Sequence, residues 1–410
     1  MSSTAALPSA RERLLTDLRD ELETLERDGL RRRLTSIDAV EGPLVRIEER
    51  TLVCWCSNDY LGLSSHPALA DAAARASSEL GVGARASRLL AGTTHWHTRL
   101  EESLAVWFGA EAAIVYPSGY LANLGTLGAL LSSSDEVFVD RLAHASLIDA
   151  ARATKAKLRV FAHHDIAQLA DWLSRTSGAR RRMIITEGVF SMDGDCAPLP
   201  SLLEVARAHD ALVYLDDAHG VFVLGETGKG TPEAAGVSHE HLLYMGTLGK
   251  ALGCQGGFVV GPRTLIDYLH NRARTFIYAT ALAVPVAAAA VAALECLRHE
   301  PHRRAVLQER ARQLHDRLRS IRLGSAQAAS HIVPVVVGDT KQAVDLARFL
   351  WERGIWAPAI RPPTVPDGTA RLRLSVTTLH TEAHIDQLVG ALQMSPHAGP
   401  PVRASSRGYD

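Results

Sequence analysis

The stretch Tyr214-Leu215-Asp216-Asp217-Ala218-His219-Gly220 places two acids and a histidine at the end of an apolar run that begins at Leu212. This run has the length of a buried strand. Comparable short runs, separated by helical stretches, occur at residues 112–116, 136–139, 183–186, 242–245 and 258–260. Strands that alternate with helices are typical of a mostly parallel sheet covered on both faces. We therefore predict an α/β fold in which ligands bind beyond the carboxyl ends of the strands.

The pattern of predicted helices and strands changes outside this alternating region. Residues 1–56 form a predicted N-terminal arm, with a strand-like stretch at 44–56 and a helix that carries a leucine stripe. The stripe consists of Leu14, Leu15, Leu18, Leu22 and Leu25. Residues 57–282 form the predicted large α/β domain, and residues 283–394 a smaller α+β domain. The smaller domain has strand-like runs at 332–337, 355–360 and 371–376. Residues 395–410 are rich in Pro, Ser, Gly and Ala, which predicts a disordered tail.

The composition excludes several classes of function. Lys plus Arg is 44 and Asp plus Glu is 45, so there is no global basic field for nucleic acid. No run is long and apolar enough for a membrane helix, and residues 1–33 lack the apolar centre of a signal peptide. We therefore expect a soluble, cytoplasmic protein that recognises its substrate locally.

Cysteine and histidine spacings indicate neither a disulfide framework nor a metal site. The five cysteines form no CxxC pair, and an odd number of cysteines does not indicate a disulfide framework. Both observations fit a reducing compartment. Cys54 and Cys56 lie two apart in an apolar run, the spacing of one face of a buried strand. The histidines at 95 and 97, and those at 163 and 164, have no third ligand at a suitable spacing, so we predict no metal.

Asp216 is the last residue of its predicted strand, and we expect its carboxylate to be buried. A buried carboxylate needs a cationic partner. The protonated nitrogen of a pyridine ring would be such a partner, and His219 follows three residues later. Taken alone, the stretch fits equally well a capping acid and a hydrogen-bonded histidine with purely structural roles.

The second motif is Met245-Gly246-Thr247-Leu248-Gly249-Lys250-Ala251-Leu252-Gly253, a lysine flanked by three glycines after a predicted strand. Glycines let the backbone approach a ligand closely. Burial would lower the pKa of Lys250 and favour the neutral amine, which can bind an aldehyde as a Schiff base. The motif is not a P-loop, because no Ser or Thr follows the lysine. The alternative is a glycine-rich turn with a solvated lysine.

The third motif, Pro117-Ser118-Gly119-Tyr120-Leu121-Ala122-Asn123, joins a predicted strand to a predicted helix. Free N–H groups at a helix start bind phosphate well. An ordinary strand-to-helix turn explains this motif at least as well when it is taken alone. Together the three motifs supply a phosphate seat, a pyridine partner and a Schiff-base lysine, which are the parts that a pyridoxal 5'-phosphate (PLP) enzyme needs.

This combination resembles the fold-type I aminotransferase-like enzymes and, within them, the α-oxoamine synthases. The resemblance extends over nearly the whole chain, and the further motifs that carry it are residues 57–63, 140–146, 186–195, 360–366 and 368–373. It implies a PLP-dependent homodimer with a shared active site. It also implies a decarboxylating condensation of L-alanine with a pimeloyl thioester, whose carrier is coenzyme A or a carrier protein, in biotin synthesis.

The resemblance implies a role for each residue near the cofactor. Lys250 would hold PLP and move the α-proton of the amino acid, and Asp216 would pair with the pyridine nitrogen. His219 and Ser191 would hydrogen-bond near the ring oxygen. His144 would stack on the ring, although it could instead cap a helix. The phosphate would be held by Gly119, Tyr120 and Thr247, and by Thr280 of the opposite subunit.

The resemblance also implies a set of substrate-binding residues. Arg361 would bind the carboxylate of the amino acid, because a planar guanidinium suits a carboxylate. Asn58 and Thr364 would lie beside the substrate, together with His144. Arg31 would face the far carboxylate of the acyl chain, although basic residues beside a helix end are common for helix-dipole reasons alone.

Two positions depart from the family pattern. Phe222 stands where the family usually has a glycine, and phenylalanine would be strained there if the position needed a positive φ. Ala279 stands where a hydroxyl residue is common, which could remove one phosphate contact.

Two rival functions stay open. Sister synthases that use glycine fit residues 246–253 about as well, and a non-catalytic subunit would share the fold, although the intact Lys250 argues against it.

Overall fold

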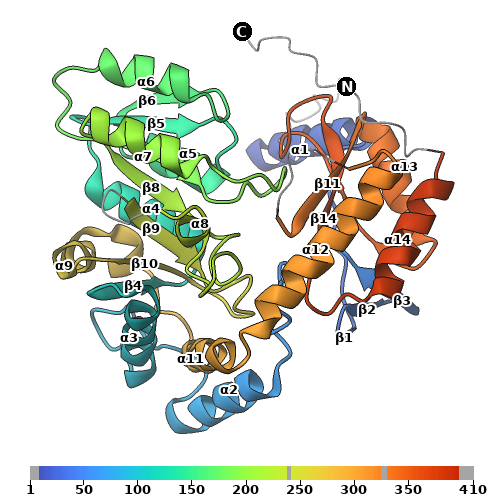
Figure 1. The fold of residues 1–410 in the computed structure, drawn as a ribbon, viewed down its shortest axis with the longest axis horizontal. Helices are drawn as coiled ribbons and strands as arrows, with labels where there is room; N and C mark the ends of the chain where they lie inside the picture. Colours follow the sequence, from blue (N-terminus) through green and yellow to red (C-terminus); the bar gives the residue numbers. More distant parts are fainter. Residues whose placement is uncertain (1–8, 238–241, 325–329, 397–410) are drawn as a thin grey trace, which may run out of the picture.

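The computed structural model describes residues 9–237, 242–324 and 330–396, and it has a large α/β part beside a smaller α+β part (Figure 1). A seven-stranded sheet forms the centre of the large part, in the order β4-β10-β9-β8-β7-β5-β6. Only β10 is antiparallel to its neighbours, which confirms the predicted, mostly parallel α/β fold. The strands are β4 (Ala112–Tyr116), β5 (Glu136–Asp140), β6 (Lys157–Phe161), β7 (Arg182–Glu187), β8 (Leu212–Asp216), β9 (Leu242–Thr247) and β10 (Gly257–Gly261).

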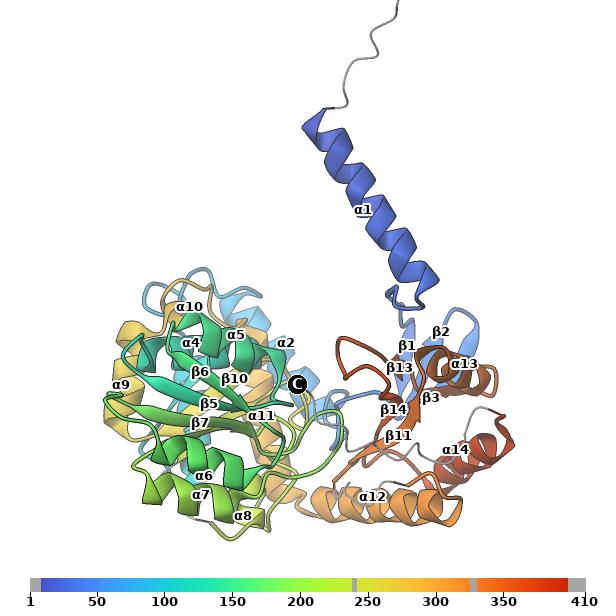
Figure 2. The same ribbon diagram turned by 90° about the horizontal axis from the view of Figure 1, so that it is seen from above.

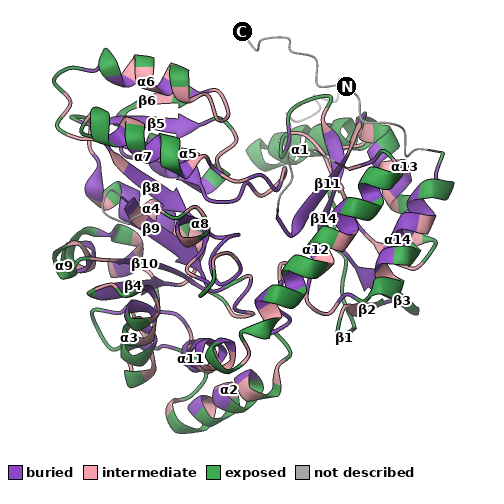
Figure 3. Cartoon of the chain, viewed as in Figure 1, coloured by how far each residue is buried: buried purple, intermediate pink, exposed green. Residues whose placement is uncertain are grey.

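Alternate residues of each strand pack toward opposite faces of this sheet. On β8, for example, Val213 and Leu215 pack into one apolar cluster and Tyr214 into the other. Helices cover both faces (Figure 2), and the buried strands lie between more exposed helices (Figure 3). One face has α4 (Gly119–Leu130), α5 (Ala145–Ala153), α9 (Arg263–Arg272) and α10 (Arg274–Ile277). The other has α3 (His95–Phe108), α6 (Ile166–Ser174), α7 (Leu199–Ala208) and α11 (Val284–His299).

The smaller part contains two short sheets. One has the order β11-β14-β13, and the other, β1-β2-β3-β12, joins strands of the N-terminal arm to a C-terminal strand. Their strands are β1 (Ala39–Glu41), β2 (Leu44–Ile47), β3 (Arg50–Cys54), β11 (Ile332–Gly338), β12 (Ile355–Trp356), β13 (Ala359–Ile360) and β14 (Ala370–Ser375). The predicted strand at 44–56 is therefore a hairpin, and the predicted strand at 355–360 is divided between the two sheets.

The remaining helices connect and cover these sheets. They are α2 (Pro67–Leu80), α8 (Thr231–Ala234), α12 (His302–Ser320), α13 (Thr340–Trp351) and α14 (Glu382–Met394). Although α11 begins just after the predicted domain boundary at residue 283, it packs on α2 and α3 of the large part. The boundary itself stays a prediction. Ser395 ends α14, and residues 397–410 of the predicted tail lie outside the described residues.

Helix α1 (Ala10–Arg27) confirms the predicted N-terminal helix and projects away from the rest of the chain (Figure 2). A capping box between Ser9 and Glu12 closes its first turn. None of its residues is buried, and all five leucines of the stripe are exposed. Among the described helices, none has both the length and the apolar character needed to cross a membrane.

Candidate active site

Asp216 ends β8 and is 5% exposed. Its carboxylate accepts hydrogen bonds from the side-chain amide of Asn123 at 2.7 Å and from the backbone N–H of Ala218 at 3.0 Å. Among the described residues, no lysine, arginine or histidine forms an ion pair with it. A buried carboxylate without a cation is costly, so this position is prepared for a positively charged ligand atom.

Asn123 on α4 orients this carboxylate. Its side-chain oxygen accepts from the Tyr214 hydroxyl at 2.9 Å, and its amide nitrogen also donates to the Ser146 hydroxyl at 2.8 Å. The rotamer of Asn123 is thereby fixed from three directions. The sequence signal was present, because Asn123 ends the quoted 117–123 motif, but its role as a support for Asp216 was missed.

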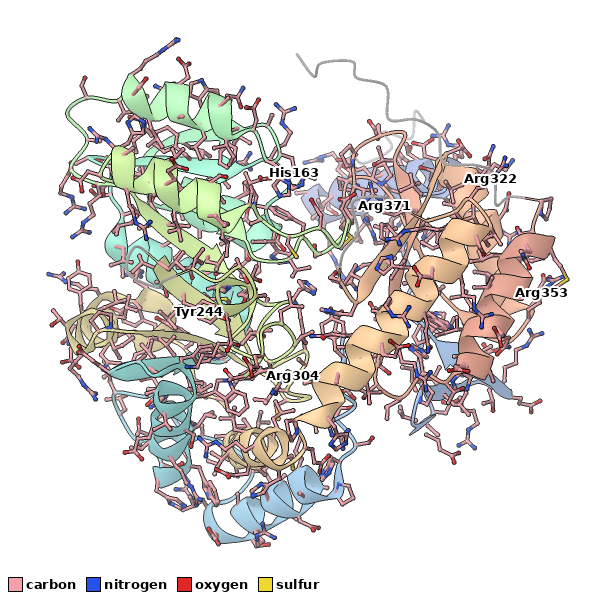
Figure 4. All side chains as sticks on the ribbon, in the orientation of Figure 1. His163, Tyr244, Arg304, Arg322, Arg353 and Arg371 are labelled. Carbon is pink, nitrogen blue, oxygen red and sulfur yellow. The ribbon has the colours of Figure 1, made fainter. Side chains whose placement is uncertain are left out.

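The neighbouring Asp217 has a structural role. It accepts from the backbone N–H of Thr231 and from the Tyr244 hydroxyl, each at 2.8 Å, and so ties α8 to β9 (Figure 4 labels Tyr244). Burial raises the pKa of Asp217 to about 7. The sequence left open whether the acids of this stretch bind a ligand or have a structural role. In the structure Asp217 has the structural role, and Asp216 faces the site.

Lys250, His219 and Tyr60 form a hydrogen-bonded chain. The Lys250 amine lies 2.8 Å from Nε2 of His219, and Nδ1 of His219 lies 2.7 Å from the Tyr60 hydroxyl. Burial and the charge of Lys250 hold the pKa of His219 well below its usual range, so the ring is neutral. If Nε2 accepts from Lys250, Nδ1 carries the proton and donates to Tyr60. The structure therefore brings the predicted residues Lys250 and His219 into direct contact.

The charge of Lys250 is tuned by its surroundings. Burial lowers the pKa of Lys250 to about 8, although the nearby Asp216 and Glu187 act in the opposite direction. Glu187 ends β7, has one carboxylate oxygen without a hydrogen-bond partner, and has a pKa raised to about 8 by burial and by Asp216. Burial thus shifts Lys250 toward the neutral amine, which is the nucleophilic form.

Arg373 on β14 is a site residue that the sequence analysis did not single out. It is 9% exposed, and it donates to the Ser191 backbone carbonyl, to Asn58 Oδ1 at 3.2 Å and to the Tyr60 hydroxyl at 3.2 Å. Its positive charge depresses the pKa values of Lys250 and His219. Within the described ranges it has no acidic partner. A buried guanidinium without a carboxylate is suited to an anionic group of a ligand.

The predicted phosphate residues also lie together. Gly119 and Tyr120 form the first turn of α4, where backbone N–H groups have no intrahelical partner. A Cβ atom on Gly119 would lie 3.6 Å from the Thr247 hydroxyl, so the threonine side chain stands beside this helix start. The Tyr120 hydroxyl donates to Asp149. The helix-start backbone and the Thr247 side chain are therefore placed where they could receive an anion, whereas the phenol of Tyr120 is bonded to Asp149.

His144 is the N-cap of α5 and is solvent-accessible. Its Nδ1 accepts from the backbone N–H of Ser146 at 3.2 Å and lies 2.7 Å from the Ser146 hydroxyl. Because Ser146 also contacts Asn123, His144 is linked to Asp216 through two side chains. The capping role that the sequence left open is thus present, and it does not prevent the exposed ring from contacting a ligand.

The predicted substrate arginines lie apart from Lys250 in the network. Arg361 donates to the Gly29 carbonyl. Arg31 pairs with Glu26 of α1 at 3.4 Å. Its neighbour Arg32 instead donates to the Thr364 hydroxyl at 3.3 Å. Of these arginines of the N-terminal arm, Arg32 is the one that contacts the loop after β13, whereas Arg31 pairs with Glu26.

The structure shows the surroundings of Phe222 and Ala279, the two residues that depart from the family pattern. Phe222 has φ of 64°, so the position does need a left-handed backbone, and its ring is fully buried against Trp107 and Phe258. Ala279 is followed by the exposed Thr280, which forms an isolated bridge with Ser87. Within the described part of one subunit, neither residue is linked to Lys250 by a hydrogen bond.

The histidines at 163 and 164 lie beside Asp140, so the third potential metal ligand that the sequence spacing did not show is present in the structure. Nδ1 of His163 lies 2.9 Å from Asp140, and Nε2 lies 2.8 Å from Asp195 (Figure 4 labels His163). Burial favours the neutral ring, but the hydrogen bonds to the two carboxylates outweigh it and raise the pKa of His163 to about 9. The sequence spacing could not reveal these acids, which come from two other segments.

A buried carboxylate, a partly neutral lysine and a helix-start anion seat define a PLP-type site at the carboxyl ends of parallel strands. Residues 50–392 match the family model described as aminotransferase class I and II, and the chain belongs to that family.

The relatives narrow the family to a particular group. The chain is 46% identical to the 8-amino-7-oxononanoate synthase of Anaeromyxobacter dehalogenans strain 2CP-1 over 93% of this chain and 96% of the relative. It is 43% identical to that of Azoarcus sp. strain BH72 over 94% and 98%. These names confirm the resemblance to the α-oxoamine synthases.

Solved structures confirm the fold-type I architecture. A serine palmitoyltransferase from S. paucimobilis with bound PLP and myriocin has a TM-score of 0.88 and 31% identity, over 93% of this chain and 97% of that one. The 8-amino-7-oxononanoate synthase of Francisella tularensis has a TM-score of 0.73 and 29% identity, over 83% and 97%.

Proposed function

We propose that the protein is a PLP-dependent acyltransferase that condenses L-alanine with a pimeloyl thioester and releases carbon dioxide, the free thiol and 8-amino-7-oxononanoate. The names of the relatives and the site support this assignment. The observation that carries it is the contact of the Lys250 amine with His219 beside an unpaired, buried Asp216. The product belongs to the biotin pathway, and five unpaired thiols support a reducing compartment such as the cytoplasm.

The residues present fit the cofactor. Asp216 forms no ion pair with any residue that the structure describes, and a pyridinium nitrogen would provide one. Lys250 offers an amine for the aldehyde. Gly119, Tyr120 and Thr247 would hold the phosphate. His219 and Ser191 would contact the ring oxygen, and His144 would stack on the ring. When bound, PLP supplies an electron-withdrawing ring that stabilises negative charge at the α-carbon of the amino acid.

Lys250 is the base that would move the α-proton. Its lowered pKa of about 8 provides a neutral amine at neutral pH, and it remains basic enough to accept a proton. His219, which is neutral, accepts a hydrogen bond from the lysine amine and so fixes its position. Tyr60 fixes His219 in turn. The chain of three side chains therefore presents the amine in one orientation.

We assign the carboxylate of alanine to Arg373, with Arg361 as the alternative that the family resemblance suggested. Arg373 is buried, lacks an acidic partner among the described residues and acts on the pKa of Lys250. Arg361 is half-buried and already donates to a backbone carbonyl. Arg373→Lys should raise the KM for alanine, because an ammonium cannot make paired hydrogen bonds. Arg361→Lys should change it little. The reverse result would return the role to Arg361.

The far carboxylate of the pimeloyl chain would meet Arg31 or Arg32. Loss of a hydrogen-bonded charge pair costs on the order of 1–3 kcal/mol. Arg31→Ala and Arg32→Ala form a matched pair of variants, and the one that binds the acyl chain should raise the KM for the thioester while leaving the KM for alanine nearly unchanged. If neither substitution changes the KM for the pimeloyl thioester, the result would favour a sister synthase with a short acyl substrate.

Product analysis decides the reaction itself. The purified protein is incubated with a mixture of alanine, glycine, pimeloyl-CoA and acetyl-CoA, and the products are identified by mass spectrometry. We expect 8-amino-7-oxononanoate as the main product, with some product from glycine, because one methyl group discriminates by only about 1–3 kcal/mol. A clear preference for glycine and acetyl-CoA would reassign the protein to the sister synthases.

We also propose a homodimer in which Thr280 reaches the phosphate of the opposite subunit. Exposed apolar side chains support an interface near this residue and along α1. They are Val82, Leu89, Leu90 and Tyr278, together with the leucine stripe. In hybrids of a Lys250→Ala subunit and a Thr280→Ala subunit, one site is doubly damaged and the other is intact. Activity should therefore partly recover, and no recovery in proven heterodimers would argue against sharing.

A further inference from the structure

Cys54 and Cys56 are adjacent thiols on one side of the chain. Cys54 ends β3, Cys56 follows two residues later, and their sulfur atoms are 3.7 Å apart. Trp55 points the other way, is fully buried and stacks on His380 at 3.8 Å. The sequence predicted that the two cysteines share one face of a strand, and the structure confirms it. The described part of the chain has no second pair of thiols in contact.

Both thiols line a pocket of about 270 Å³. Its walls are mainly apolar, formed by Ile37, Val45, Trp356 and Leu379. A water molecule occupies about 30 Å³ in the liquid, so the pocket has room for a small neutral molecule beside the sulfurs. None of the residues assigned to PLP lines this pocket, which is therefore separate from the cofactor site.

The pair differs chemically from the other cysteines. The two thiols share one hydrogen bond, which lowers the pKa of the Cys54 thiol and raises that of Cys56. Burial instead raises the pKa values of Cys196 and Cys254 to about 11 and about 12. Because the thiolate is the nucleophile, Cys54 is the most readily oxidised sulfur of these four.

We propose that Cys54 and Cys56 are a peroxide-sensitive dithiol that closes reversibly into an intrachain disulfide. The Cys54 thiolate attacks one oxygen of hydrogen peroxide, the O–O bond breaks, and hydroxide leaves, so Cys54 becomes a sulfenic acid. The Cys56 sulfur then attacks the Cys54 sulfur, the S–S bond forms, and the hydroxyl leaves as water with the thiol proton. Two thiols and one peroxide thus give one disulfide and two waters.

Closure of this bond would reach the active site. The sulfurs must approach from 3.7 Å to about 2.05 Å, and this closure would pull on the short segment that leads from Cys54 to Asn58. Two residues after Cys56, Asn58 accepts from Arg373 at 3.2 Å and from the Tyr60 hydroxyl at 3.1 Å. Movement there would disturb the residues that orient His219. Oxidation should therefore lower activity, and a thiol reductant should restore it.

Mass spectrometry tests the bond directly. Trypsin releases residues 51–75, a peptide that contains Cys54 and Cys56 and no other cysteine. The protein with its cofactor is treated with increasing hydrogen peroxide, alkylated with iodoacetamide and digested. We expect the peptide to lose two hydrogen atoms and to escape alkylation, and dithiothreitol should restore double alkylation. The bond should form before Cys196, Cys254 or Cys296 is oxidised.

Three variants make the test specific. Cys54→Ser and Cys56→Ser each leave a single thiol that alkylates or overoxidises, whereas Cys296→Ser should close as the unmodified protein does. Double alkylation of the peptide at peroxide levels that already oxidise the other cysteines would overturn the proposal. So would oxidation that dithiothreitol cannot reverse. Full activity of the closed form would refute the coupling to the active site. The mass readout does not depend on the assigned reaction.

Discussion

Replacing His163 by glutamine should remove a pH-dependent part of the stability. His163 lies between Asp140, which ends β5, and Asp195, in the loop that carries Ser191 (Figure 4). Asp140 also accepts from the backbone N–H of Leu142 at 2.9 Å, two residues before His144. The imidazolium therefore joins two segments that carry predicted site residues. Glutamine keeps a side chain of similar length but cannot be charged.

The size of the effect follows from the pKa shift. The pKa of His163 is raised from 6.5 to about 9 in the folded protein. One unit corresponds to about 1.4 kcal/mol, so the shift contributes about 3 kcal/mol to the free energy of unfolding. Because the folded value is the higher one, this contribution is complete below about pH 6.5 and is lost as the pH rises through about 9.

Urea unfolding at a series of pH values from about 6 to about 10 measures this dependence. The difference in unfolding free energy between the unmodified protein and His163→Gln should narrow by about 3 kcal/mol over that range. His164→Gln is the matched control, because burial and the charge of His163 lower the pKa of His164 and its ring is neutral there. A constant difference for His163→Gln would refute the charged cluster.

Three further predictions concern the site and the strained position. Lys250→Ala should leave PLP bound only non-covalently and abolish turnover, so borohydride should fix no cofactor to the protein, as mass spectrometry would show. Asp216→Asn should retain the fold, as judged by circular dichroism, but lower kcat on the order of 100-fold, because an amide does not stabilise the pyridinium; near-normal turnover would remove Asp216 from this role. Phe222→Gly should be more stable to urea than Phe222→Ala by about 1 kcal/mol, because both lose the ring but only glycine relieves the positive φ; equal stability would mean that the backbone is not strained.

The sequence predicts most of the central sheet because its strands are buried on both faces. Residues 112–116 and 212–216 are continuous apolar runs, and the structure has strands with these bounds. Strand β6 was missed because Lys157 and Arg159 interrupt its apolar pattern and pair with Glu136 of the adjacent strand. The opposite edge strand, β4, is buried along its whole length and keeps a continuous apolar run, so burial rather than position in the sheet sets the strength of the sequence signal.

Some of the site residues could be predicted from the sequence and others could not. Asp216 and Lys250 were predictable because Asp216 ends one strand and Lys250 closely follows another, and ligands bind at the carboxyl ends of such strands. Tyr60 and Arg373 were not, because their roles depend on contacts between segments far apart in the chain. Tyr60, for example, meets His219 across 159 positions. Local spacing identifies residues that a strand end presents, but it does not identify the residues that other segments bring to them.

The arrangement of charge in the site determines how the substrate can lie. Among the described residues, the buried carboxylate of Asp216 and the buried guanidinium of Arg373 each form no ion pair, and they lie at different places in the site. The lysine amine interacts with both, since each shifts its pKa. In the proposed function, Asp216 would hold the pyridinium of the cofactor and Arg373 would hold the carboxylate of the amino acid, so the two charges would be compensated together. Alanine and glycine satisfy this arrangement equally, because they carry the same charges. Discrimination between them must come from the fit of one methyl group, about 1–3 kcal/mol. Under the proposed function, the choice of acyl chain would depend instead on the arginines at 31 and 32.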